Sequence, residues 1–324
     1  ALLCAWGPAS LGPGTMRDIA LTLIFFSFLV FVYARPYIGI YIWTWLSLMN
    51  PHRLTYGFAF SFQFDQITAI VTLLAMLFSY EPKRIPWTRE TVLLLIFILW
   101  MLLTTFFAFY PDLAWEQWGK VWKIMLMIYI TLMLINTRQK LDWLVWVVVL
   151  SLGLFGVKGG IFTIVTGGAH RVQGPLGSFI SGNNEMALAL IMIIPLMRYL
   201  QLQATSFWIR RGLAISMLLT GIAAIGSQSR GALVGMVVMG AFLFLKSRKK
   251  ILTLIPILLI VGVAVMFMPQ EWHDRMSTIT KSAEDQDESV QGRFVAWRTA
   301  FSLAKDRLVG GGFETFQPGL YYRY

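Results

Sequence analysis

Arginine residues in turns rich in glycine and serine are the residues of this sequence that could bind an anion. In "AIGSQSRGALVG", residues 225–236, Arg230 follows Ser229 and lies between Gly226 and Gly231. Backbone amides of a tight turn and a guanidinium directed at one small volume form an anion site. An arginine that snorkels to the interface at the end of a helix has the same pattern. The residues alone leave both interpretations open.

A second arginine, Arg293, begins the stretch "GRFVAWRTAFSLAKDR". Apolar residues at spacings of three and four predict an amphipathic helix from Gly292 to about Arg307, which a run of three glycines, Gly310 to Gly312, then stops. Arg293 in the first turn would add its charge to unpaired backbone donors and favour an anion. The alternative is a surface arginine on a helix that rests on a membrane.

The stretch "HRVQGPLGSFISGNNEMALAL" holds further polar candidates between two apolar runs. Arg171 lies in its irregular part, and Asn183 or Asn184 is expected to cap the helix that follows. Glu185 would then fall in the first turn, where a negative charge is favoured. Lys158, in "FGVKGG", is an intramembrane charge and therefore a site candidate, unless its flanking glycines let it reach the interface.

The sequence does not indicate a metal site, a nucleotide site or a catalytic nucleophile. Three scattered histidines and a single cysteine, Cys4, give no metal-ligand spacing and no intramolecular disulfide. No glycine-rich nucleotide loop, serine nucleophile motif or carboxylate pair stands out, so we expect neither a metal nor a cofactor. The loop "NPHRLTYGFAFSFQFD", residues 50–65, crowds aromatics around one arginine, which fits an interfacial belt or a lid over a lipid-facing groove.

The elements that must position these residues are apolar helices. Hydrophobic residues make up 57% of the chain and charged residues 13%, far from the composition of a soluble domain. We therefore predict an all-α, polytopic integral membrane helical bundle with about ten transmembrane helices. The apolar runs are 19–34, 37–49, 66–80, 90–109, 122–135, 142–165, 184–203, 212–226, 231–245 and 251–268.

Charged residues predict the orientation of this bundle. One set of alternate loops carries twelve Lys and Arg residues and the opposite set five, which makes the first set cytoplasmic and leaves the N-terminal sidedness open. The turn around Arg230, the loop around Arg171 and everything after Pro269 then lie outside. Because much of the net charge of +11 lies in cytoplasmic loops, it does not indicate nucleic-acid binding.

Three segments follow from these observations. Residues 1–15 precede a plausible start at Met16 and are interpreted as an upstream extension. Residues 16–268 form the predicted transmembrane bundle. Residues 269–324 form a predicted periplasmic loop segment with the amphipathic helix, and "GLYYRY" stops in mid-loop, so a C-terminal part is expected to be missing.

Two motifs in order carry a resemblance to a known family. "SQSRGA" followed some sixty residues later by "QGRFVAWRTAFSLAKDRLVGGGFETF" resembles the O-antigen ligase and polymerase superfamily, which pairs an SxSRG turn with a GRxxxW helix and a glycine-rich stop. "MRDIAL", "MNPHRLTYGFAF", "RVQGPLGSFISGNNEMALALIM" and "GGGFETF" are more narrowly similar to the O-glycosylation ligases associated with exosortase systems. The likeness runs from Met16 to Tyr324.

The resemblance implies a periplasmic-side glycan ligase in the bacterial inner membrane. Its donor would be a glycan on undecaprenyl diphosphate, moved en bloc to a protein hydroxyl or a lipid, without metal or cofactor. Arg230 and Arg293 match the arginines of the two motifs and would hold the diphosphate, with Arg171 a further candidate and Ser229, Asn183, Asn184 and Lys158 in support. The family's catalytic histidine lies beyond the glycine-rich stop, past Tyr324, and the upstream His273 is not assigned its role.

Two alternatives remain open at this stage. A polysaccharide polymerase of the same superfamily would join two lipid-linked repeats and use the same arginines. A transporter or flippase for a polyprenyl lipid belongs to another class of protein and predicts internal repeats and polar residues at the midplane. The candidate arginines of this sequence, Arg171, Arg230 and Arg293, instead lie at the predicted outer face.

Overall fold

The structure, a computed structural model, describes most of the chain as helices joined by loops. The described residues are 13–55, 57–246 and 288–323, together with 250, 255, 258–259, 262, 268–270 and 272–273. Every regular element among them is an α-helix or a short 3-10 helix, as the predicted fold class requires. The predicted run 251–268 and residues 1–12 of the predicted extension lie almost entirely outside the described residues.

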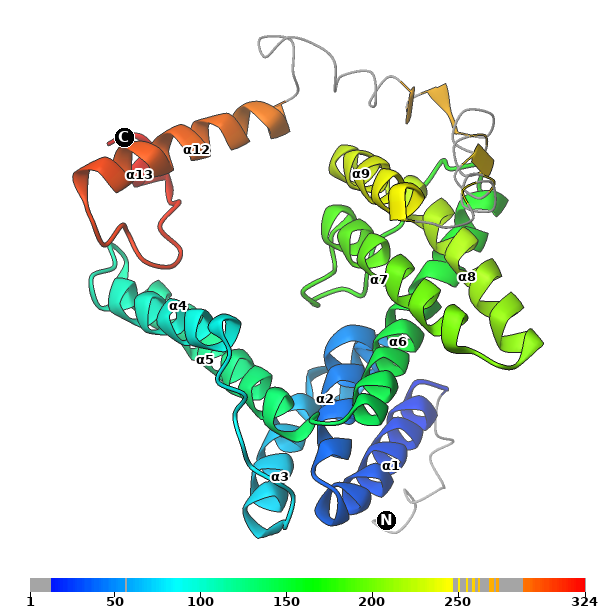
Figure 1. The fold of residues 1–324 in the computed structure, drawn as a ribbon. Coiled ribbons are helices and arrows are strands. Elements are labelled where there is room, and N and C mark those ends of the chain that lie inside the picture. The colour runs from blue at the N-terminus through cyan, green and yellow to red at the C-terminus, as the bar shows by residue number, and fades with distance from the viewer. Residues whose placement is uncertain are drawn as a thin grey trace, which may run out of the picture. The chain divides into compact units, whose positions relative to one another are not determined.

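The chain divides into two units that alternate in sequence. The first comprises the described parts of 1–80 and 137–276, and the second those of 81–136 and 277–324. In the first unit the longer elements are α1 (Pro13–Ala34), α2 (Tyr37–Met49), α3 (Phe64–Phe78), α6 (Arg138–Val165), α7 (Asn183–Gln203), α8 (Phe207–Gly226) and α9 (Arg230–Lys246). The second contains α4 (Arg89–Phe106), α5 (Pro111–Leu134), α12 (Glu288–Asp306) and α13 (Pro318–Tyr321). Figure 1 labels these helices.

Five of the described helices have the length and apolarity of a membrane span. They are Met16–Ala34 within α1, then α4, α6, α7 and α8, and two shorter apolar helices, α2 and α3, accompany them. The predicted runs up to 231–245 all coincide with helices of the structure. The five candidate spans support a multi-pass membrane protein, whereas the predicted number of about ten spans stays a prediction.

Glycines on one face of α6 allow this helix to pack closely against α8 (Figure 1). Gly153, Gly156, Gly159 and Gly160 are buried. A Cβ atom on Gly156 would overlap Thr220, and one on Gly160 would overlap the backbone carbonyl of Leu219. Small residues of this kind let helix backbones approach closely in membrane proteins. The α6–α8 pair thereby supports the loop and the turn that follow these two helices.

Replacing Gly160 by alanine should loosen this helix pair. The atom that the new methyl group meets is backbone, which cannot rotate away as a side chain can, so we expect a destabilisation at the upper end of about 1–3 kcal/mol. Thermal unfolding of the purified protein in detergent would measure it. Gly212→Ala, within α8 and with open space around the new Cβ, is the matched control, and an equal loss in both variants would contradict this packing argument.

Candidate functional site

The turn between α8 and α9 is built by its own polar side chains. Ser227 is buried and donates its hydroxyl to the carbonyl of Ala224 at 2.6 Å. Gln228 adopts a left-handed backbone with φ of 55°, which reverses the chain. Ser229 then caps α9, because its Oγ accepts the backbone N–H of Ala232 at 3.2 Å. Arg230 is the first residue of α9 and is half-buried there.

The two asparagines at the start of α7 bind this turn. Asn183 Nδ2 donates to the carbonyl of Ser227 at 2.9 Å, and Asn184 Oδ1 accepts the hydroxyl of Ser229 at 2.6 Å. The prediction that one of them caps α7 is wrong, because the N-cap is Gly182 and makes no side-chain cap bond. Glu185 does lie in the first turn as predicted. The asparagines therefore hold α7 to the arginine-bearing turn instead of closing their own helix.

The loop between α6 and α7 reaches the same turn through Arg171. Its Nε donates to Gln228 Oε1 at 3.2 Å, and Gln228 Nε2 donates to the carbonyl of Gly168 at 3.0 Å. A backbone bond from Val172 N to the carbonyl of Gly226, at 3.0 Å, fixes the loop beside the end of α8. Arg171 and the turn of Arg230 are therefore parts of one hydrogen-bonded cluster, with the exposed Arg171 at its surface.

Gln228 is a member of this cluster that sequence reasoning did not single out. It connects Arg171 to Gly168, and it does so from a left-handed backbone position. The only signal for it in the sequence is its place between the two serines of the turn. Lys158, by contrast, is exposed on α6 and makes no hydrogen bond or ion pair with this cluster among the described residues.

Arg293 belongs to the second unit and lies on α12. This helix is described from Glu288 to Asp306, so Arg293 lies in its second turn and the prediction of a first-turn position is wrong. The unpaired N–H groups of a helix are those of its first turn, which removes the expected backbone contribution to an anion site. The exposed guanidinium remains, on a helix that bears exposed aromatic residues. These are Phe294, Trp297 and Phe301.

The glycine-rich stop after α12 packs against the corner between α4 and α5 in the same unit. α12 ends at Asp306, and Gly310 and Gly312, with φ of 65° and 81°, then turn the chain away from the helical direction. Phe109 N donates to the carbonyl of Gly311 at 3.0 Å, and Arg307 Nη2 donates to that of Phe107, also at 3.0 Å. The predicted stop is confirmed, and it anchors the end of α12.

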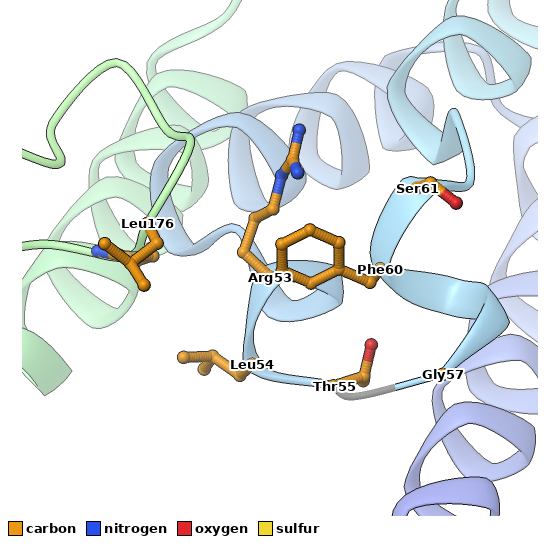
Figure 2. Close-up of a pocket in the computed structure, with 8 residues that line it drawn as sticks. Arg53, Leu54, Thr55, Gly57, Phe60, Ser61 and Leu176 are labelled. Carbon is orange, nitrogen blue, oxygen red and sulfur yellow. The ribbon is translucent and has the colours of Figure 1, made fainter.

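A cavity of about 590 Å³ lies beside the aromatic loop between α2 and α3. The guanidinium of Arg53 stands over the ring of Phe60, with 4.8 Å between its Cζ and the ring centroid, and Leu176 of the α6–α7 loop lies opposite (Figure 2). The other lining residues are Leu54, Thr55, Gly57, Ser61 and Pro175. Burial, and then the charge of Arg53, lower the pKa of the neighbouring His52, so this imidazole favours its neutral form.

Removing the hydroxyl that joins α7 to α9 should weaken the cluster measurably. Ser229→Ala loses both the cap of α9 and the bond to Asn184, and we expect a loss of about 1 kcal/mol in the free energy of unfolding. The control is Ser206→Ala, because Ser206 is the N-cap of α8 and makes no side-chain cap bond. Thermal unfolding measures both, and a Ser229→Ala variant as stable as the control would contradict the capping role.

The comparisons with known proteins divide the chain near the start of α8. Residues 16–205 match a family of unknown function, DUF5935. Residues 215–324, which contain both the turn of Arg230 and the helix of Arg293, match the O-antigen ligase family. No curated protein and no solved structure matches the chain. Because the first match covers more than half of its residues, the chain belongs to the DUF5935 family, and it carries an O-antigen ligase domain after it.

Proposed function

We propose that this protein is a glycan ligase of the bacterial inner membrane that acts at the periplasmic face. It takes a glycan from undecaprenyl diphosphate and transfers it en bloc to an acceptor hydroxyl on a protein or a lipid. The observation that carries the proposal is the O-antigen ligase match over residues 215–324. The apolar helices of the chain support a membrane-embedded reaction with a lipid-linked donor.

The cluster around the α8–α9 turn supplies a means of holding the donor. Asn183, Asn184 and Gln228 fix the turn by bonds to three different partners, so the start of α9 and its arginine are positioned before any substrate arrives. Arg171 adds a second guanidinium from the α6–α7 loop. Guanidinium groups pair with phosphate oxygens in a two-pronged geometry that lysine cannot reproduce.

The chemistry requires such a positive site. In the transfer, the bond between the anomeric carbon of the first sugar and the diphosphate oxygen breaks, and a bond to the acceptor oxygen forms. The acceptor hydroxyl gives up its proton to a base, and undecaprenyl diphosphate leaves with additional negative charge. Arg230, with Arg293 and Arg171, would stabilise this charge where it develops, which is an effective form of catalysis in a poorly hydrated site.

A reconstituted reaction tests the proposal. The protein as its gene encodes it, in proteoliposomes, receives an undecaprenyl-diphosphate-linked glycan and, separately, candidate protein and lipid acceptors. Glycan appearing on an acceptor, with release of undecaprenyl diphosphate, supports the ligase. Growth of the glycan on its own carrier would identify a polymerase instead, and movement of intact donor across the bilayer without bond cleavage would identify a transporter.

A further inference from the structure

Arg53 is a guanidinium without a carboxylate partner among the described residues. It is half-buried, and its guanidinium stacks on Phe60 with 4.8 Å between its Cζ and the ring centroid. Stacking on a ring face holds the plane of a guanidinium while leaving its N–H groups at the edge available for oxygen acceptors. The cavity that Arg53 lines contains no acidic side chain. Its charge is therefore available to a bound anion.

Two loops distant in the sequence hold this guanidinium in place. Asn50 has a left-handed backbone with φ of 48° and ends α2, and Pro51 then begins the short 3-10 helix Pro51–Leu54 that carries Arg53. From the other side, the α6–α7 loop approaches at Gly177, where a Cβ would lie 3.3 Å from Arg53 Nη1 and φ is 72°. Only glycine combines this conformation with this close approach easily.

The surroundings of the cation are apolar and exposed. Leu54 is 41%, Phe60 38% and Leu176 75% exposed. The loop joins the ends of two apolar helices, α2 and α3, where a membrane protein meets the headgroup region of a bilayer. A cavity of about 590 Å³ lies within the roughly 300–1,000 Å³ typical of small-molecule sites. Charge and apolar walls together fit an amphiphile better than a freely soluble ion.

We propose that the cavity lined by Arg53, Phe60 and Leu176 binds the phosphate group of a lipid, with Arg53 on the phosphate and the apolar rim on the adjoining chain. Two sources share this chemistry, a phospholipid of the bilayer and a polyprenyl phosphate. The first is independent of the proposed function, and the second rests on it. The site is separate from the hydrogen-bonded cluster of Arg171 and Gln228, although the same α6–α7 loop contributes to both.

Native mass spectrometry of the full-length protein, released from detergent micelles, tests the proposal. The lipid probes are phosphatidylglycerol, phosphatidylcholine and undecaprenyl phosphate, each titrated separately, and inorganic phosphate is the soluble comparison. Arg53→Gln should weaken binding of at least one phosphate-bearing lipid by about tenfold or more, the usual loss for a charge-assisted contact. Arg211→Gln is the matched control, because Arg211 also stacks on a phenylalanine, at 4.3 Å from Phe207, but does not line the cavity.

The pattern of losses identifies the source. A loss for both phospholipids supports a bilayer lipid, and a loss for undecaprenyl phosphate alone supports the carrier. Arg53→Lys keeps the charge without the planar fork and should fall between wild type and Arg53→Gln, which excludes a mere failure to fold. Unchanged lipid binding in Arg53→Gln, or equal occupancy by inorganic phosphate, overturns this proposal and leaves the ligase test unaffected. Conversely, intact lipid binding at Arg53 with no glycan transfer would refute only the proposed function.

Discussion

Replacing Arg230 by alanine is expected to lower kcat/KM for glycan transfer by about 10²–10³. In the proposed reaction this variant would remove one preorganised positive group from the leaving diphosphate, and losing a single donor of this kind typically costs about 2.7–4 kcal/mol of transition-state stabilisation. Because Arg230 is the first residue of α9 and is only half-buried, its removal leaves no large hole in the helix packing. The expected effect is therefore on the rate and not on the fold.

Two companion variants separate charge from geometry. Arg230→Lys keeps a positive charge but loses the two-pronged pairing with phosphate, so we expect it to recover only part of the activity. Arg210→Gln removes an exposed arginine at the start of α8, remote in sequence from the turn, and should leave transfer unchanged. Initial rates with the reconstituted protein give the measurement. A wild-type kcat/KM in the Arg230→Ala variant would contradict the proposed role of Arg230 in binding the diphosphate.

The helices were the most predictable part of this protein, because the apolar pattern that indicates each of them lies within the helix itself. Each predicted apolar run up to 231–245 overlaps a helix, and an apolar stretch specifies a helix without information from elsewhere in the chain. The break at Arg230 was equally visible, since two glycines and two serines interrupt the apolar pattern. Membrane-spanning length is a separate property, and five described helices have it.

The roles of the asparagines were not predictable, because their partners are distant. Asn184 bonds Ser229, 45 residues away, and Asn183 bonds Ser227, 44 residues away. The preference of asparagine for N-cap positions depends on local sequence. Here the two asparagine side chains instead form hydrogen bonds to residues that are distant in the sequence. Gln228 was missed for the same reason, as its partners Arg171 and Gly168 come from another loop.

The start of α12 shows a different failure of local reasoning. Gly292 was interpreted as the beginning of the helix, yet the described helix contains it. A glycine inside a helix costs about 1 kcal/mol relative to alanine, and the stability of the neighbouring turns can offset this cost.

The cavity at Arg53 could not be predicted from the sequence. It forms only because Leu176 and Gly177 approach a loop more than a hundred residues earlier in the chain.

Arg293→Ala should also reduce kcat/KM for transfer, by up to about 10²–10³ if its guanidinium carries a share of the diphosphate charge equal to that of Arg230. Its position in the second turn of α12 leaves the side chain as the only contribution of this residue, since the free backbone donors lie earlier in the helix. Arg298→Gln is the matched control, because Arg298 is exposed on the same helix, and it should leave the rate unchanged.

A double-mutant cycle decides whether the two arginines act on one diphosphate. Independent sites give additive losses, whereas residues that bind the same group show an interaction energy of about 0.5–3 kcal/mol. We therefore expect Arg230→Ala combined with Arg293→Ala to lose less activity than the product of the two single losses, because the first removal already disrupts the shared contact. If the two losses of transition-state stabilisation, measured from kcat/KM of the four proteins, are strictly additive, the two guanidinium groups do not bind the same diphosphate. In that case Arg171, which is bonded to the turn of Arg230 through Gln228, would be the remaining candidate for the second cation of the site.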